Sequence, residues 1–169
     1  MNRILIAASA LALLAAPALA ADSLKVETSK NCSFTIKLRP DLAPKHVAQV
    51  TKLAAAGFYN GIIFHRVIDG FMAQTGDPTG TGMGGSKEPN LPAEFSKEHY
   101  ARGTVGMARS NDPNSANSQF FVMFADGAFL DGQYTVWGNV DETGMKCVDQ
   151  IAKGEPPATP DKMTKVTVQ

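Results

Sequence analysis

The sequence predicts a mainly β domain, a barrel or a sandwich with helical covers, behind a short leader. Apolar runs of strand length are separated by Gly, Pro, Asp and Asn, as in sheets whose strands are joined by turns. Apolar residues recur at helical spacing in only two segments. No internal repeat or long linker interrupts the 169 residues, so one domain accounts for the chain after the leader.

The first twenty residues have the composition of a cleavable signal peptide. Arg3 supplies a positive start, residues 4–16 supply an apolar stretch, and Ala-Leu-Ala at 18–20 supplies a small-x-small cleavage signal. The apolar stretch is too short and too rich in Ala for a permanent span, which takes about 20 apolar residues. We therefore expect a domain of residues 21–169 with no stable membrane anchor, exported to a Gram-negative periplasm.

The charge balance excludes one class of partner. Loss of Arg3 with the leader takes the 16 basic residues to 15 against 16 acidic ones, a net charge of about −1. Proteins that bind nucleic acid neutralise phosphates with many basic side chains. A near-neutral chain without a long basic run therefore argues against nucleic acid as the main partner.

The first elements of the domain are a strand and a helix. Apolar residues alternate with polar ones at Phe34, Ile36 and Leu38, which predicts a strand. Pro44 stands where a helix can begin, and Gly57 stands where a left-handed cap would end it. A shorter helix is predicted over 144–153, with Gly154 at its end. The apolar positions at helical spacing in the first helix are Val47, Val50, Leu53 and Ala54.

The run FHRVIDGFMAQTGD, residues 64–77, predicts two strands joined by a tight turn. Side chains alternate across a strand, so Met72 and Gln74 share one face, beside Arg66, while Ala73 points to a crowded interior. We expect Met72 to be exposed there. An exposed apolar side chain next to a planar cation and an amide suits recognition of an extended peptide backbone.

A second run, SANSQFFVMFADGAFLDGQYTVWGNV at 115–140, contains a strand around QFFVMF. Phe120, Val122 and Phe124 share one face and suit a core. The opposite face carries Gln119, Phe121 and Met123. That face is too apolar to be only solvated, so it is predicted to belong to the same binding surface.

With these two runs in their order, the chain resembles the cyclophilin family of peptidyl-prolyl cis/trans isomerases, over nearly everything after the leader. The resemblance implies a closed eight-stranded antiparallel β-barrel with an α-helix over each open end. It also implies an enzyme that accelerates rotation about X-Pro bonds while exported proteins fold. The alternative is a cyclophilin-like module that holds proline-containing chains without turnover. Retention of the family's groove residues favours catalysis.

The reaction itself indicates which groups are needed. Amide resonance sets a barrier of about 18–20 kcal/mol, and no bond is made or broken when it is crossed. A catalyst must bind the twisted amide more tightly than the planar forms, and needs no nucleophile, metal or cofactor. A fixed guanidinium can donate to the twisted nitrogen or the neighbouring carbonyl, so Arg66 is the candidate catalytic residue.

The remaining site residues follow from the resemblance, position by position. Those that match the proline pocket are Phe71, Met72, Phe121 and Leu130. Gln74 and Ala108 match positions that bind substrate backbone, Arg109 stands where many relatives have Asn, and Gln119 lies at the edge of the groove. Phe129 replaces a Trp of many eukaryotic members and Tyr134 replaces a His. Both changes resemble bacterial members and predict weak affinity for cyclosporin-like ligands.

Other features have plainer interpretations. His65 is predicted to be a hydrogen-bonded structural residue, because prolyl rotation transfers no proton. The run GTGMGG at 80–85 matches a dinucleotide pattern only formally and is predicted to be a surface loop beside the groove. The three histidines show no metal-ligand spacing. Cys32 and Cys147 suit either one disulfide or two buried side chains, and the sequence does not decide between them.

Overall fold

The computed structural model describes residues 21–169, so the predicted signal peptide lies outside the described residues. Within this range, no helix has both the length and the apolar composition of a transmembrane span. The elements in chain order are β1 (Ser23–Thr28), β2 (Ser33–Leu38), α1 (Pro44–Ala55), β3 (Arg66–Ile68), β4 (Met72–Thr75), β5 (Thr104–Met107), β6 (Phe120–Met123), the short 3₁₀ helix η1 (Ala128–Leu130), β7 (Val136–Val140), α2 (Glu142–Val148) and β8 (Met163–Val168).

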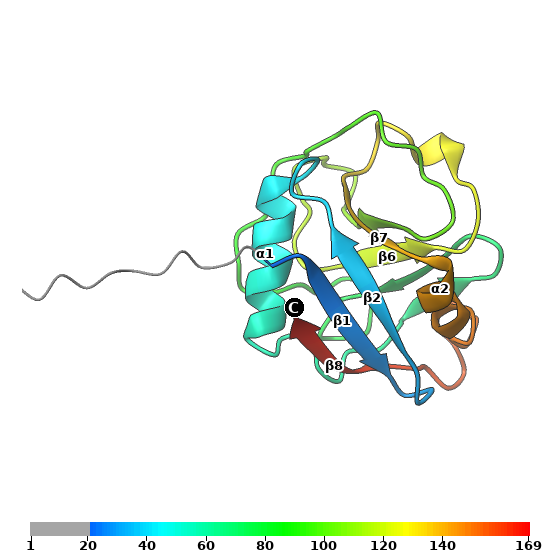
Figure 1. Cartoon of the computed structure of the whole chain (residues 1–169). Coiled ribbons are helices and arrows are strands. Elements are labelled where there is room, and N and C mark those ends of the chain that lie inside the picture. Colours follow the sequence, from blue (N-terminus) through cyan, green and yellow to red (C-terminus); the bar gives the residue numbers. More distant parts are fainter. Residues whose placement is uncertain (1–20) are drawn as a thin grey trace, which may run out of the picture.

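The eight strands form one antiparallel sheet in the order β3-β4-β6-β5-β7-β2-β1-β8. The sheet curls, with α1 and α2 on opposite sides of the molecule (Figure 1). Among the described residues, the two edge strands β3 and β8 do not pair with each other in a ladder. The segments that precede them meet only at an isolated bridge between Ile63 and Lys162. The result is a curled half-barrel with two helices, and full closure of the barrel stays a prediction.

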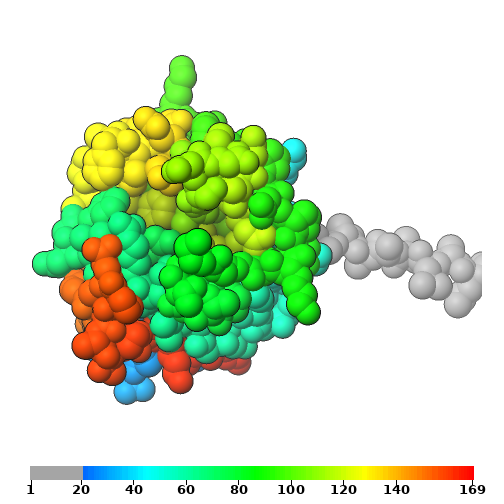
Figure 2. Space-filling view, turned by 180° about the vertical axis from the view of Figure 1, so that it is seen from behind, coloured from blue at the N-terminus to red at the C-terminus, as the bar shows by residue number. Residues whose placement is uncertain are grey.

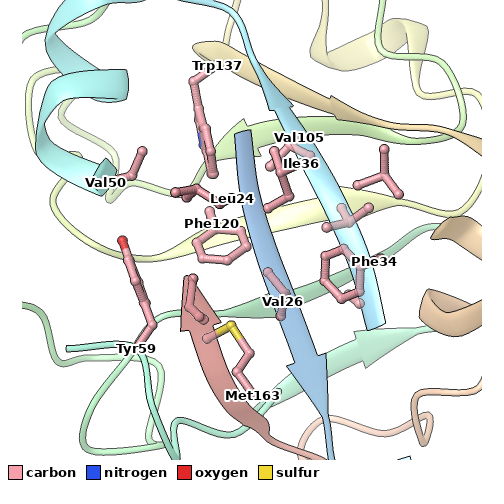
Figure 3. Close-up of a cluster of buried hydrophobic side chains, with 14 of the residues drawn as sticks. Leu24, Val26, Phe34, Ile36, Val50, Tyr59, Val105, Phe120, Trp137 and Met163 are labelled. Carbon is pink, nitrogen blue, oxygen red and sulfur yellow. The ribbon is translucent and has the colours of Figure 1, made fainter. Parts of the chain in front are cut away.

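The core fills the inside of the curl (Figure 3). The predicted alternation of β2 is confirmed, because its apolar side chains are buried and their neighbours are exposed. Trp137 lies completely buried and meets the ring of Phe120 edge-on, at 5.3 Å between centroids. Strand β1, which the sequence analysis did not single out, adds Leu24 and Val26 to the same interior.

Helix α1 has the predicted limits. Pro44 occupies its first turn and Gly57 adopts a positive φ of 72° just after its end. Its first amides are satisfied from outside the helix, because Glu94 accepts hydrogen bonds from the backbone N–H of Lys45 at 3.1 Å and of His46 at 3.0 Å. The helix packs against β7 and β8 and covers one end of the curl.

Helix α2 differs from its predicted limits of 144–153. It begins earlier because the Asp141 side chain caps it, accepting from the Gly144 N–H at 2.7 Å. It ends at Val148, and the chain then turns back through shorter-range backbone bonds. Gly154 is therefore not a helix cap. It forms a backbone bridge to Val67, which holds the following segment beside β3.

The two cysteines form a disulfide, which the sequence left undecided. Cys32 lies in the turn between β1 and β2, and Cys147 lies on α2. Their Cα atoms are 5.7 Å apart, although the residues are separated by 115 positions in the chain. The bridge therefore closes a loop that includes most of the domain and ties α2 to the sheet.

We predict that loss of this bridge lowers stability without affecting the fold at low temperature. A disulfide typically contributes about 2–4 kcal/mol to the free energy of unfolding. A Cys32→Ser, Cys147→Ser protein should lose about that much free energy of unfolding in urea. Reductant should destabilise the natural protein equally and leave the double variant unchanged. Equal urea midpoints for both proteins would contradict the prediction.

Candidate active site

The candidate site lies on the outer face of the sheet, where neighbouring strands align three predicted residues. Arg66 on β3 pairs with Gln74 on β4, and Gln74 pairs with Phe121 on β6. The adjacent row along the strands faces the other side of the sheet, since Ala73 and Val122 pair and point into the main core. The predicted division of the two faces is therefore confirmed.

The row continues to Gly106 on β5, which pairs with Phe121. A side chain at Gly106 would meet the Phe121 ring at 2.5 Å and the Tyr100 hydroxyl at 2.6 Å. Because Gly106 has none, the two rings stack over the sheet with their centroids 5.8 Å apart. They belong to a second apolar cluster, separate from the core, together with Met72, Met123, Leu130 and Val136.

A cavity of about 130 Å³ opens above this cluster. Its lining consists of Arg66, Phe71, Met72, Gln74, Ala108, Arg109, Phe121, Leu130 and Tyr134. The expectation of an exposed Met72 is wrong: only 1% of the residue is accessible. Met72 packs within the second cluster rather than projecting into solvent. Figure 2 shows this face, hollowed between the teal, green and yellow segments.

The Arg66 guanidinium lies at the rim of the cavity with 43% of its side chain exposed. Its Nε donates to Glu155 Oε1 at 2.8 Å, and its Nη1 lies 3.5 Å from Gln74 Oε1. Sequence reasoning missed Glu155, because 89 residues separate it from Arg66 and no local pattern connects them. The cation is thus held by two partners while it stays accessible.

Two amide side chains form the polar wall of the site. Gln74 Nε2 donates to Gln119 Oε1 at 2.9 Å. Gln119 Nε2 donates in turn to the carbonyls of Gly82 at 3.0 Å and Gly84 at 2.8 Å. These donors and acceptors fix the orientation of both amides.

Beyond this wall lies a larger open hollow of about 560 Å³. The glycine-rich run at 80–85 contributes to its lining, so this loop lies beside the groove as predicted. Its lining residues are Gln74, Gly82, Met83, Gly84, Gly85, Ser86, Asn90, Ala108, Arg109, Ser110, Ser115, Asn117 and Gln119. The sequence analysis missed Asn117, whose side chain accepts from the Ser86 N–H at 2.8 Å and supports the loop.

Asp77 organises the glycine-rich loop and was also missed, although an acidic residue just before such a run is a usable signal. Its buried carboxylate accepts from the backbone N–H of Thr79 at 2.7 Å, Gly82 at 2.6 Å and Gly84 at 3.1 Å. Burial opposes ionisation, but these hydrogen bonds outweigh it and lower the pKa of Asp77 to about 2. The loop that orients Gln119 thus depends on one carboxylate.

The opposite wall is built from Arg109 and Tyr134. The Arg109 guanidinium lies over the Tyr134 ring, 4.5 Å from its centroid, and donates to the Gln133 carbonyl at 2.8 Å. The Tyr134 ring meets Phe121 edge-on with centroids 5.9 Å apart. Stacking and hydrogen bonding together hold the Arg109 side chain in place beside Ala108.

Phe129 and Leu130 lie on η1 and differ in their surroundings. Leu130 is buried in the cavity wall, whereas Phe129 is 67% exposed and outside the lining. The Phe129 ring packs against Phe71 at 5.4 Å between centroids, so it extends the apolar rim.

His99 holds the segment around η1 by contacts to Asp131 at 2.7 Å and Asp126 at 2.5 Å, and the two carboxylates raise the pKa of His99.

The burial of His65 agrees with the predicted structural role, but the predicted hydrogen bond does not form with good geometry. The residue is buried, yet neither ring nitrogen has a hydrogen-bond partner within residues 21–169. Gln119 gives its donors to Gly82 and Gly84, and Gly82 lies against the His65 ring. Burial lowers the pKa of His65, which favours a neutral ring. Across the same range, no three His, Cys, Asp or Glu side chains gather as metal ligands would.

Comparison with known proteins identifies the class. The family model described as cyclophilin type peptidyl-prolyl cis-trans isomerase/CLD matches residues 23–168. A probable peptidyl-prolyl cis-trans isomerase of Brucella suis is 56% identical over 156 residues, 83% of this chain and 79% of that protein. The isomerase-like 1 protein of Aspergillus oryzae is 43% identical over 125 residues, 70% of this chain and 75% of that protein.

Solved structures agree. A cyclophilin from Hirschia baltica matches with a TM-score of 0.78 at 31% identity, over 86% of this chain and 73% of its own. A Cryptosporidium parvum cyclophilin type isomerase was solved in the presence of the dipeptide Ala-Pro. It matches with a TM-score of 0.78 at 27% identity, over 87% of this chain and 98% of its own. The chain belongs to the cyclophilin family and is a peptidyl-prolyl cis-trans isomerase.

The Asp77 carboxylate predicts a pH dependence of stability. Its pKa of about 2 lies below the usual 3.8, so its contribution is present above pH 4 and is lost as the pH falls towards 2. A difference of nearly two pH units corresponds to about 2 kcal/mol. Between pH 5 and pH 2, the natural protein should lose about that much more unfolding free energy in urea than Asp77→Asn. Parallel pH profiles for the two proteins would refute the role of Asp77.

Proposed function

We propose that this isomerase accelerates X-Pro rotation in exported polypeptides as they fold, through non-covalent stabilisation of the twisted amide. The observation that carries the proposal is the placement of a partly exposed Arg66 at the rim of an apolar cavity. The predicted leader at 1–20 supports export to the periplasm. Unfolded or partly folded chains that contain proline are the proposed partners.

The proline ring of the substrate would occupy the 130 Å³ cavity. A small apolar ring fits a lining that includes Phe71, Phe121 and Leu130, because removal of apolar surface from water is favourable. The Cryptosporidium relative was solved with an Ala-Pro dipeptide, which supports this class of ligand. With the ring held, rotation about the X-Pro bond moves the preceding residue across the rim of the cavity.

Arg66 would interact with the nitrogen lone pair that becomes localised when the amide twists. Twisting the amide removes resonance and leaves a basic nitrogen, which a nearby guanidinium stabilises more than it stabilises either planar form. Gln74 and Gln119, held by their mutual hydrogen bond, would contact the substrate backbone together with Ala108. No proton transfer or covalent intermediate is required, so His65 needs no chemical role.

Replacement of Arg66 tests the proposal. In Arg66→Ala, kcat/KM on an X-Pro peptide should fall at least about tenfold, or roughly 1.4 kcal/mol of transition-state stabilisation. Arg66→Lys should recover little, because Lys lacks the planar fork that reaches two partners. A protease-coupled assay at matched folded fraction is the measurement. Full activity of Arg66→Ala would rule out this mechanism, and peptide binding without turnover by the natural protein would favour a holding module.

The exposed Phe129 predicts weak binding of cyclosporin-like ligands. A Trp at this position would add an N–H donor and contact area beside Phe71. One neutral hydrogen bond contributes about 0.5–1.5 kcal/mol, and the added contact increases this further. Phe129→Trp should therefore strengthen inhibition by about one to two powers of ten, with peptide turnover unchanged. Inhibitor titrations that give the same affinity for both proteins would exclude this position as the determinant.

A further inference from the structure

On its outer side, Arg66 is paired with Glu155, which does not line the cavity. Glu155 Oε1 accepts from Arg66 Nε at 2.8 Å, and 53% of the Glu155 side chain is exposed. The contact joins the segment after α2 to β3. In Figure 2 the orange-red segment that contains Glu155 lies against the teal segment that contains Arg66.

The backbone holds Glu155 at this place. Gly154 and Val67, the chain neighbours of Glu155 and Arg66, each donate a backbone N–H to the carbonyl of the other at 2.8 Å. Gly154 has a positive φ of 145°, and a side chain there would meet the Pro156 carbonyl oxygen at 2.8 Å. The position before Glu155 therefore suits glycine, and the two side chains are brought together by paired main chains.

The two partners of Arg66 contact different nitrogens of its guanidinium group. Glu155 occupies Nε on the outer side, and Gln74 lies near Nη1 on the sheet. Nη2 has no partner among residues 21–169 and belongs to a side chain that lines the cavity. The guanidinium fork is rigid, so restraint of two of its nitrogens sets the direction of the third.

We propose that Glu155 is a positioning residue, which holds the Arg66 guanidinium in the orientation that the twisted amide requires. This inference rests on the proposed catalytic role of Arg66. Exposed ion pairs add little to the free energy of unfolding, so stability does not account for the arrangement. A long side chain at a rim has many rotamers, and restriction to one orientation raises the fraction of encounters that are productive.

The test compares turnover in Glu155→Ala and Glu155→Gln with that of the natural protein. In Glu155→Ala, kcat/KM on an X-Pro peptide should fall about three- to tenfold, since misplaced catalytic groups cost at least this much. Glu155→Gln should lose less kcat/KM than Glu155→Ala, because its amide oxygen still accepts from Arg66 Nε. The thermal midpoint should stay unchanged in both variants.

A matched control comes from β1. Lys25 and Glu27 form another exposed pair, with 40% and 43% of their side chains accessible and Nζ 3.5 Å from Oε1. Glu27→Ala removes a similar carboxylate from a pair that does not line the cavity, and should leave kcat/KM unchanged. Similar losses of activity in Glu155→Ala and Glu27→Ala would indicate a general charge effect and would overturn the inference.

The decisive comparison is the double variant with Arg66→Ala. If Glu155 acts through Arg66, Glu155→Ala should cause no further loss in the Arg66→Ala background. The same loss in both backgrounds, or full or increased activity in the single Glu155→Ala variant, would overturn the positioning role. A fully active Arg66→Ala protein would instead overturn the catalytic role of Arg66, and the inference with it, so the two failures are distinguishable.

Discussion

The register of the β3-β4-β6 pairing is the constraint on which the site depends. It places Arg66, Gln74 and Phe121 in one row on the outer face, with the Ala73–Val122 row facing the core. Because side chains alternate with a period of two, a slip by one residue would bury the guanidinium and expose the core. The buried inner row therefore enforces the register. The same hydrophobic interactions that stabilise the sheet also align the groups of the candidate active site.

Segments outside this row complete it. The Asp77 carboxylate shapes the glycine-rich loop, which orients Gln119 and through it Gln74. The segment after α2 supplies Glu155 to Arg66 through the backbone bridge at Gly154. Each of these contacts is modest in energy, yet together they leave the polar side chains around the cavity few alternative orientations. Such preorganisation is what a reaction without covalent chemistry demands of its catalyst.

The sequence predicted the parts of this account that depend on local pattern. Alternation around Ala73 and Val122 identified the two faces, and Pro44 and Gly57 marked the limits of α1. Other features were missed or wrong, most of them because they depend on contacts between distant parts of the chain. Met72 is covered by a second apolar cluster, α2 is capped earlier by Asp141, and His65 has no hydrogen-bond partner within the described chain. The Cys32–Cys147 bridge and the Arg66–Glu155 contact join residues about a hundred positions apart, beyond the reach of any sequence period.

We propose that the site binds proline peptides and also lowers the barrier to their rotation. Two-dimensional NMR exchange on an X-Pro peptide, with the protein present in small molar proportion, separates these two properties. Free peptides interconvert over tens to hundreds of seconds at 25 °C. With the protein, cross peaks between the cis and trans forms should appear within a fraction of a second, alongside shifts of protein signals around Arg66. Shifts of those signals without cross peaks would contradict the account, because the groove would then bind proline without catalysing its rotation.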